Sequence, residues 1–273
     1  MELHAGWTEY RVEGGSVAAY LARPAAAAGP LPGLLVIQEM WGVDDHIEDL
    51  TRRYAEAGYA ALAPDLFSHG AGRPPALGRE RVEAFKRFMD GVGPGVWGNP
   101  AGLQAALAQL PAEEGRQVAE TQQTLMGGAM RDGARHLADL RAAAAWLRAQ
   151  PCCAGRRLGS VGYCMGGGLS AQLAATDAGL AAAAIYYGAS LPDDRIPAVG
   201  CPVLGMYGGD DARITDSVPA FAAAMAAAGK SFTHRIYPGA PHAFFNDTRS
   251  TYRPDVARDA WARTLMFFTE HLG

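Results

Sequence analysis

The sequence predicts an α/β fold, in which helices cover both faces of a mostly parallel sheet of about eight strands. Apolar, β-rich runs alternate with helical patterns along the chain, which favours β-α-β units. Several runs are continuously apolar, as at residues 34–37, and such strands are typically buried on both faces of a parallel sheet. With 273 residues, 49% of them hydrophobic, the chain is long enough to bury one large core.

The expected strands run from near the N-terminus to residue 237. They span residues 7–12, 16–22, 33–38, 59–63, 157–162, 182–187, 202–207 and 232–237. Glycine and proline mark several helix ends between them, and apolar residues recur at helical spacing. We expect helices at residues 44–57, 137–149, 169–175, 216–229 and 254–272, the fourth of them capped by Asp216.

Residues 68–133 interrupt this alternation. They contain glycine- and proline-rich segments at residues 72–75 and 91–95, followed by a glutamine-rich helical pattern that reaches Gly127 and Gly128. The stretch is too long for a plain loop. We therefore expect a mostly helical insertion, or cap, within a single domain that spans residues 1–273.

Composition and charge argue against several classes of protein. The 24 basic and 28 acidic side chains give a formal charge of −4, which lacks the basic excess that nucleic-acid binding needs. No apolar run is suited to span a membrane, and residues 1–11 do not resemble a secretory signal peptide. Four cysteines are too few for a disulfide framework. We expect a cytoplasmic protein with neither a nucleic-acid nor a membrane partner, and the sequence leaves its oligomeric state open.

The strongest local motif is Gly-Tyr-Cys-Met-Gly at residues 162–166, which has the G-x-S-x-G pattern with Cys164 in place of serine. An apolar strand precedes it and a helix of small residues follows. Glycines are needed because side chains at their positions would collide in so sharp a turn. The N-terminus of the following helix directs unpaired N–H groups at the sulfur, which favours a thiolate. We interpret Cys164 as the nucleophile of an α/β-hydrolase fold.

Two other interpretations of this region are weaker. Ser160 lies inside the strand, and Leu158 rather than glycine stands two residues before it. The pattern Gly166-x-Gly168-x-x-Ala171 also matches a dinucleotide-binding fingerprint, but no acidic residue ends the next strand.

The remaining members of a triad should follow in the order acid, histidine. Asp211 lies in the loop after the strand at 202–207, with Asp210 as the alternative, and we prefer Asp211 because its spacing from Gly208 leaves room to aim the carboxylate. His242 lies between the last strand and the C-terminal helix, where the histidine of this fold belongs. No histidine, cysteine or aspartate cluster has metal-ligand spacing, so we expect no metal.

An oxyanion hole needs two preorganised N–H donors. The Met165 amide should supply one of them, and the Met40 amide, in the loop after the strand at 33–38, should supply the other. Glu39 would then stand beside the nucleophile, which is unusual for a loop carboxylate.

These residues, together with several further segments, resemble the dienelactone hydrolase family, the carboxymethylenebutenolidases. The matching segments are residues 36–43, 45–47, 58–67, 162–167, 186–188, 208–211 and 242–244. The resemblance implies hydrolysis of a lactone or ester by a Cys-His-Asp triad, with a small-molecule substrate and no cofactor. It also implies that Glu39 contacts the resting thiol and helps to activate it when substrate binds.

In the best-studied members of the family, two arginines and a tyrosine bind a substrate carboxylate. Arg81 matches the first arginine, whereas Phe85 replaces the tyrosine and Asn246 stands where the second arginine would fall. Trp41 and Tyr187, within matching segments, are further candidates for substrate binding. The departures leave open a broad carboxylesterase or thioesterase that acts on neutral substrates, and also a non-catalytic binding module of the same fold.

Overall fold

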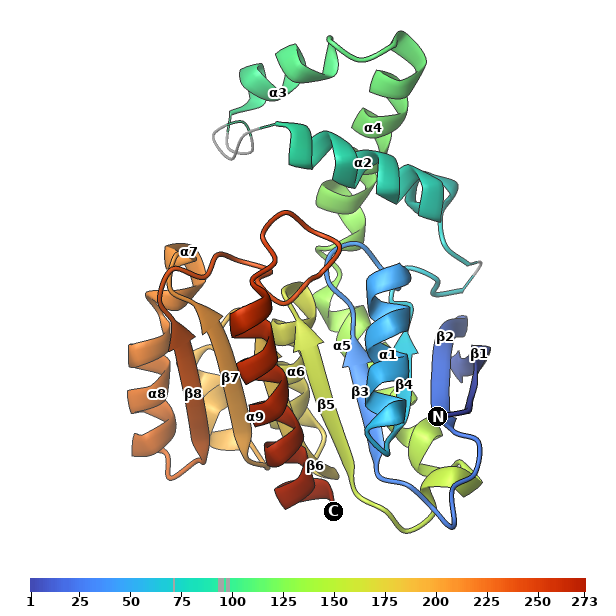
Figure 1. Cartoon of the computed structure of the whole chain (residues 1–273), viewed down its shortest axis with the longest axis vertical. Coiled ribbons are helices and arrows are strands. Elements are labelled where there is room, and N and C mark those ends of the chain that lie inside the picture. Colours follow the sequence, from blue (N-terminus) through green and yellow to red (C-terminus); the bar gives the residue numbers. More distant parts are fainter. Residues whose placement is uncertain (71, 93–95, 97–98) are drawn as a thin grey trace.

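The computed structural model describes residues 1–70, 72–92, 96 and 99–273. In the described part of the chain, eight strands form one sheet in the order β1-β2-β4-β3-β5-β6-β7-β8 (Figure 1). Their bounds are β1 (Leu3–Val12), β2 (Gly15–Pro24), β3 (Gly33–Ile37), β4 (Ala60–Pro64), β5 (Leu158–Tyr163), β6 (Leu180–Tyr186), β7 (Val203–Gly208) and β8 (Phe232–Tyr237). Each of them overlaps a strand that the sequence predicts; β8 has the predicted bounds, and the ends of the others are shifted by up to a few residues.

The sheet is mostly parallel. Strands β1, β2 and β4 pair in antiparallel fashion, and every other neighbouring pair is parallel. Strands β3, β4, β5 and β7 are buried along their whole length, which explains their continuous apolar runs. The predicted fold class is therefore confirmed. Because the carboxyl ends of parallel strands meet at one edge, the loops after β3, β5, β7 and β8 come together there.

Helices cover both faces of the sheet (Figure 1). Helices α1 (Asp45–Glu56) and α9 (Pro254–Leu272) pack on one face, and α5 (Gly133–Arg148), α6 (Met165–Thr176) and α8 (Val218–Ala227) pack on the other. Each face has its own hydrophobic cluster, with the sheet between the two. This two-sided burial holds the sheet rigid beneath its loops.

The helix at 216–229 was predicted wrongly at its start. A short helix α7 (Ala212–Thr215) comes first, and Asp216 ends it instead of capping α8. Ser217 occupies the N-cap position of α8, but its hydroxyl donates to the Ile214 carbonyl and does not cap the helix. Helices α5 and α6 begin earlier than predicted: Asp132 caps α5, and the first turn of α6 is rich in glycine, which by propensity suggests a loop.

Among the described residues of the predicted insertion, three α-helices stand above the carboxyl edge of the sheet (Figure 1). They are α2 (Arg79–Gly91), α3 (Pro100–Leu107) and α4 (Ala112–Thr124), and a π-helical turn at Leu125–Ala129 leads from α4 toward α5. Residue 71 and residues 93–95, 97 and 98 of this insertion lie outside the described residues. We call these three helices the cap.

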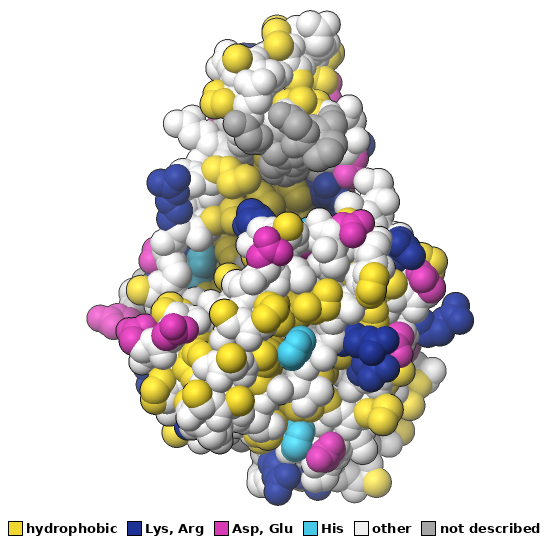
Figure 2. Space-filling model, turned by 90° about the vertical axis from the view of Figure 1, so that its left-hand side faces the viewer, with side chains coloured by type: hydrophobic (Ala, Val, Ile, Leu, Met, Phe, Trp, Pro, Cys, Tyr) yellow, Lys and Arg dark blue, Asp and Glu magenta, His cyan; other side chains and the backbone are white. Residues whose placement is uncertain are grey.

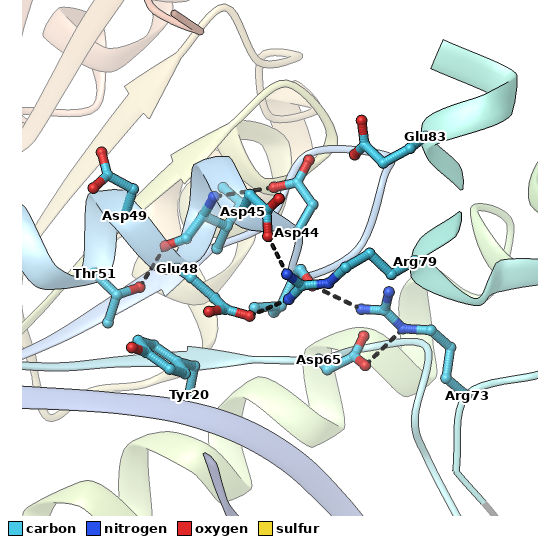
Figure 3. Close-up of polar contacts among 12 residues, drawn as sticks. Tyr20, Asp44, Asp45, Glu48, Asp49, Thr51, Asp65, Arg73, Arg79 and Glu83 are labelled. Carbon is cyan, nitrogen blue, oxygen red and sulfur yellow. Dashed lines mark hydrogen bonds and ion pairs between the residues drawn. The ribbon is translucent and has the colours of Figure 1, made fainter. Parts of the chain in front are cut away.

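Charged side chains fasten the cap to the sheet domain (Figure 3). Arg79, at the start of α2, pairs with Asp45 and Glu48 of α1. In the segment before α2, Arg73 Nε lies 2.9 Å from Asp65 Oδ2. Apolar side chains of α2 and α4 join residues of the loop after β3 in a third hydrophobic cluster. Among the described helices, none has the length and apolar character that crossing a membrane requires.

Candidate active site

Cys164 occupies the sharp turn between β5 and α6. Its φ of 54° and ψ of −115° are rare for a residue with a side chain, and such strain is held only where the surroundings impose it. A Cβ at Gly162 would lie 1.8 Å from the Gly166 carbonyl oxygen, and one at Gly166 would lie 2.4 Å from that of Ile37. Both glycines are therefore required, and they bring the end of β3 against the turn that carries the thiol.

His242 and Asp211 meet at the same edge of the sheet. His242 Nδ1 lies 2.5 Å from Asp211 Oδ2, and the Asp211 side chain is only 7% exposed. Asp210 is exposed, and its N–H donates to the Ala240 carbonyl at 3.0 Å. The turn after β7 thus directs Asp211, and not Asp210, toward the histidine.

The electrostatic environment of His242 favours the imidazolium. Burial by itself lowers the pKa of His242, but hydrogen bonds to Asp211 and to Cys164 outweigh burial and raise the pKa to about 10. The ring of Tyr187 packs edge-on against the imidazole, with 5.0 Å between the two centroids. His242 therefore interacts with both the buried Asp211 carboxylate and the Cys164 thiol.

Two backbone amides belong to the segments that meet at the Cys164 turn. Met165 is the first residue of α6, where the N–H groups have no partner inside the helix. Met40 follows Glu39 in the loop after β3, which the close approach at Gly166 places beside the turn. In the described chain, neither of these two amides donates to a protein acceptor. Both N–H groups are free to bind an oxygen that develops negative charge.

Glu39 is 2% exposed, and two side chains share its carboxylate. Tyr187 Oη donates to Oε1 at 3.1 Å, and Asn246 Nδ2 donates to Oε2 at 2.7 Å. The contact with the resting thiol that the family resemblance implies is not found among the described hydrogen bonds. Tyr187 and Asn246 are both 0% exposed, so their polar groups serve Glu39 and lie behind the surface that a substrate would contact.

Arg81 does not join this group of residues. Its guanidinium donates to the Gln117 carbonyl at 2.8 Å and to Glu120 Oε2 at 2.7 Å, both on α4. Phe85 is fully buried, and its ring packs edge-on against Trp41 with 5.8 Å between centroids. The two residues of α2 that the family pattern suggests for substrate binding are therefore engaged within the cap and at its base.

Sequence reasoning missed two cations that flank Trp41. Lys86 Nζ lies 2.5 Å from Asp44 Oδ2 and 5.7 Å from the Trp41 ring. The Arg249 guanidinium lies 5.0 Å from the same ring, and Arg249 also donates to Asp90 of α2 at 2.7 Å. A signal for Lys86 was present, because it falls on the apolar stripe of α2 where a lysine needs a buried partner.

The recess below the cap is lined by hydrophobic side chains (Figure 2). The side chains of Met40 and Met165 are partly buried and pack against the third cluster, to which Trp41, Phe88 and Met89 belong. The thiol thus lies near an apolar wall that the cap supplies. Within the residues that the structure describes, no three histidine, cysteine, aspartate or glutamate side chains are placed to hold a metal ion.

This chain is similar to several known proteins along nearly its whole length. The model of the dienelactone hydrolase family matches residues 17–272. A protein of Saccharolobus solfataricus, provisionally named carboxymethylenebutenolidase, is 32% identical over 94% of this chain and 95% of its own length. A protein of the same provisional name from Escherichia coli is 31% identical over 98% of this chain and 88% of its own.

Solved structures show the same fold. A crystal structure from Klebsiella pneumoniae, provisionally described as a dienelactone hydrolase, has a TM-score of 0.75 at 30% identity, over 99% of this chain and 100% of that one. An acylaminoacyl peptidase from Pyrococcus horikoshii has a TM-score of 0.66 at 14% identity, over 100% of this chain and 42% of that one. The second likeness concerns the fold alone.

Proposed function

This chain belongs to the dienelactone hydrolase family, whose members hydrolyse lactones or esters, and we propose that it does so through a Cys164–His242–Asp211 triad and an acyl-enzyme. The observation that carries the proposal is the position of His242, which hydrogen bonds to Asp211 and lies close enough to Cys164 for the thiol to raise its pKa. A nucleophile, a base and a carboxylate that orients the base are the minimum for covalent catalysis of acyl transfer.

In the first half of the proposed reaction, the Cys164 thiolate attacks the carbonyl carbon of the substrate. The electron pair of the carbonyl moves to its oxygen, and the amides of Met40 and Met165 stabilise the resulting oxyanion. When the tetrahedral intermediate collapses, the bond from carbon to the alcohol oxygen breaks. The imidazolium of His242 protonates that oxygen, and a thioester with Cys164 remains.

In the second half, water hydrolyses the thioester. His242 is now neutral and takes a proton from the water as its oxygen attacks the acyl carbon. The second tetrahedral intermediate expels the Cys164 thiolate, and the carboxylic acid product leaves. A lactone substrate gives a single product in this scheme, because its alcohol and acyl groups belong to one molecule.

A specific observation favours neutral substrates over carboxylated ones. The charge of Arg81 is paired with that of Glu120, and the Asn246 amide already donates to Glu39. The recess is lined by apolar side chains. A broad carboxylesterase or thioesterase that acts on neutral, largely apolar substrates is therefore the second candidate function. A hydrolysis screen of paired lactones and aryl esters, with and without a carboxylate, distinguishes the two.

Replacement of the nucleophile tests the proposal directly. Cys164→Ala should abolish hydrolysis of the best substrate, because no other group supplies the covalent bond, while the circular-dichroism spectrum stays that of the wild type. Mass spectrometry of rapidly quenched wild-type enzyme should detect an acyl adduct on the peptide that contains Cys164. Turnover above a few per cent in a folded Cys164→Ala protein would place the nucleophile elsewhere.

A further inference from the structure

The carboxylate of Glu39 is a buried anion whose described hydrogen-bond partners are both neutral. Tyr187 and Asn246 supply one donor to each oxygen, and all three residues are at most 2% exposed. Among the described residues, no lysine or arginine forms an ion pair with Glu39. With no cation to hold it, the direction of this carboxylate depends on its two neutral donors.

Glu39 lies within the immediate surroundings of the thiol. The backbone that leads into it, at Ile37 and Gln38, would be within 2.5 Å of a Cβ at Gly166, in the turn that carries Cys164. Tyr187 lies near both Glu39 and Cys164. Burial raises the pKa of Tyr187 well above its ordinary value, and the charges of Glu39, Tyr163 and Cys164 raise it further.

Asn246 is oriented by its own loop. Its Oδ1 accepts from the Thr248 N–H at 3.0 Å and from Thr248 Oγ1 at 2.7 Å. The other end of the amide, Nδ2, therefore points at Glu39. An asparagine suits this place because it accepts on one side and donates on the other.

Tyr187 is also held in an imposed conformation. Its φ of 40° lies in the left-handed region, which is an outlier for a bulky residue. The Tyr187 N–H donates to the Met206 carbonyl at 2.8 Å, and the hydroxyl is fixed on Glu39. Such strain persists only when the surroundings over-determine it, which indicates that the direction of this hydroxyl is specified.

We propose that Asn246 and Tyr187 are positioning residues, which hold the Glu39 carboxylate turned away from the Cys164 thiol. The inference rests on the proposed role of Cys164 as the nucleophile. A carboxylate turned toward the sulfur would accept the S–H hydrogen bond and stabilise the neutral thiol. While Asn246 and Tyr187 donate to Glu39, this carboxylate does not accept a hydrogen bond from the thiol. His242 can then take the proton of the Cys164 thiol.

The titratable groups that face the two reacting partners come from several elements. Tyr163, at the end of β5, and Tyr187, after β6, both sense the charge of Glu39. His242 faces Cys164 and Asp211 from the loop after β8. The two tyrosines stay protonated through the neutral range, because burial raises the pKa of each. The two tyrosines therefore add no change of charge to the profile across the neutral range.

The test is the rate at which iodoacetamide alkylates Cys164 in the full-length enzyme without substrate, measured from pH 5 to pH 10. Mass spectrometry of the peptide that contains Cys164 separates it from the other cysteines. Asn246→Leu should slow alkylation at pH 7 by about tenfold and move its midpoint to higher pH, as expected from one new hydrogen bond to the neutral thiol. Tyr187→Phe should act in the same direction and removes only a hydroxyl.

One control variant loses a similar bond without touching Glu39. Tyr186→Phe removes the neighbouring buried hydroxyl, which bonds to Ala260 and Thr264. This variant should retain the alkylation profile of the wild type.

The decisive comparison is made in the Glu39→Gln background, where adding Asn246→Leu or Tyr187→Phe should cause no further change. A shift that persists in this background, or wild-type profiles in both single variants, would overturn the proposal. If Asn246→Leu does not fold, the Tyr187→Phe pair carries the same test. These results do not depend on turnover, so they are separable from a failure of the triad, which Cys164→Ala would reveal.

Discussion

The orientation of His242 depends on a single carboxylate. Asp211 is buried and lies 2.5 Å from the imidazole, whereas its neighbour Asp210 is exposed. The adjacent pair differs in direction because Gly208 and Gly209 pack against the segment that leads to the histidine. A Cβ at Gly208 would lie 2.5 Å from the Ala240 carbonyl oxygen. This close packing fixes the conformation of the turn, and in that conformation the Asp211 side chain points inward.

Asp211→Asn should lower kcat by about 10⁴-fold, as the loss of the orienting aspartate does in serine proteases, because the imidazolium loses its partner and its tautomer changes. Asp210→Asn is the matched control and should keep nearly full activity, since its side chain is in solvent. Steady-state kinetics on one ester substrate compares them. A large loss of kcat in Asp210→Asn would show that Asp210, and not Asp211, is the residue that orients His242.

The raised pKa of His242 gives a second prediction, on stability. The folded protein holds this proton up to about pH 10, whereas an unfolded histidine titrates near 6.5. The contribution to stability is therefore complete below about pH 6.5 and is lost as pH rises through about 10. The melting temperature of wild type should exceed that of His242→Gln most at low pH, and the difference should shrink toward pH 10. Parallel melting profiles would contradict the shift.

At the level of elements, the contact of α2 with the sheet domain depends on ion pairs of very different burial. The Lys86 and Asp44 side chains are 6% and 4% exposed, and Asp44 also caps α1 by accepting from the Ile47 N–H at 3.0 Å. The Arg79 side chain is 48% exposed. Because water screens exposed charges, the buried pair should matter far more to stability.

Lys86→Met should reduce the free energy of unfolding by about 3–5 kcal/mol, since it leaves the buried Asp44 carboxylate without its cation. Arg79→Met is the matched control on the same helix and should cost about 0–1 kcal/mol. Chemical denaturation of both variants measures the difference. Equal losses would mean that the pairs contribute by their number and not by their burial.

At the level of the whole molecule, the cap stands above the edge of the sheet that carries the candidate site (Figure 1). Its α2 packs Phe85 against Trp41, next to the Met40 amide, while Arg81 on the same helix pairs with Glu120 of α4. The apolar cluster at the base of the cap and the paired state of Arg81 point the same way, toward substrates without a carboxylate.

Arg81→Ala should therefore leave the selectivity of the enzyme unchanged. The ratio of kcat/KM for a carboxylated lactone to that for its neutral analogue should match the wild-type ratio, while melting temperature falls because α2 and α4 lose a contact. An Arg81→Ala loss of about 10-fold or more confined to the carboxylated substrate would restore Arg81 as a substrate ligand, as expected for one charge-assisted hydrogen bond.

The sequence by itself determined the sheet and the triad candidates. Buried parallel strands need continuous apolar runs. The turn at Cys164 has no room for side chains at Gly162 and Gly166. Both features therefore appear as short patterns in the local sequence. The position of His242 follows from chain order after the last strand. The sequence also predicts an insertion, because residues 68–133 break the alternation of strands and helices.

Tertiary structure decided which side chain meets which. Asp210 and Asp211 are chemically equal in sequence, and only the packing of their turn separates them. Asn246 is 207 residues from Glu39 in sequence, and Arg81 is 39 from Glu120, so no local pattern could pair them. The partner of a polar side chain often comes from a segment far away in the sequence, which folding brings alongside. A local sequence pattern carries no information about such a partner, so only the folded structure shows whether the side chain faces substrate or a neighbouring residue.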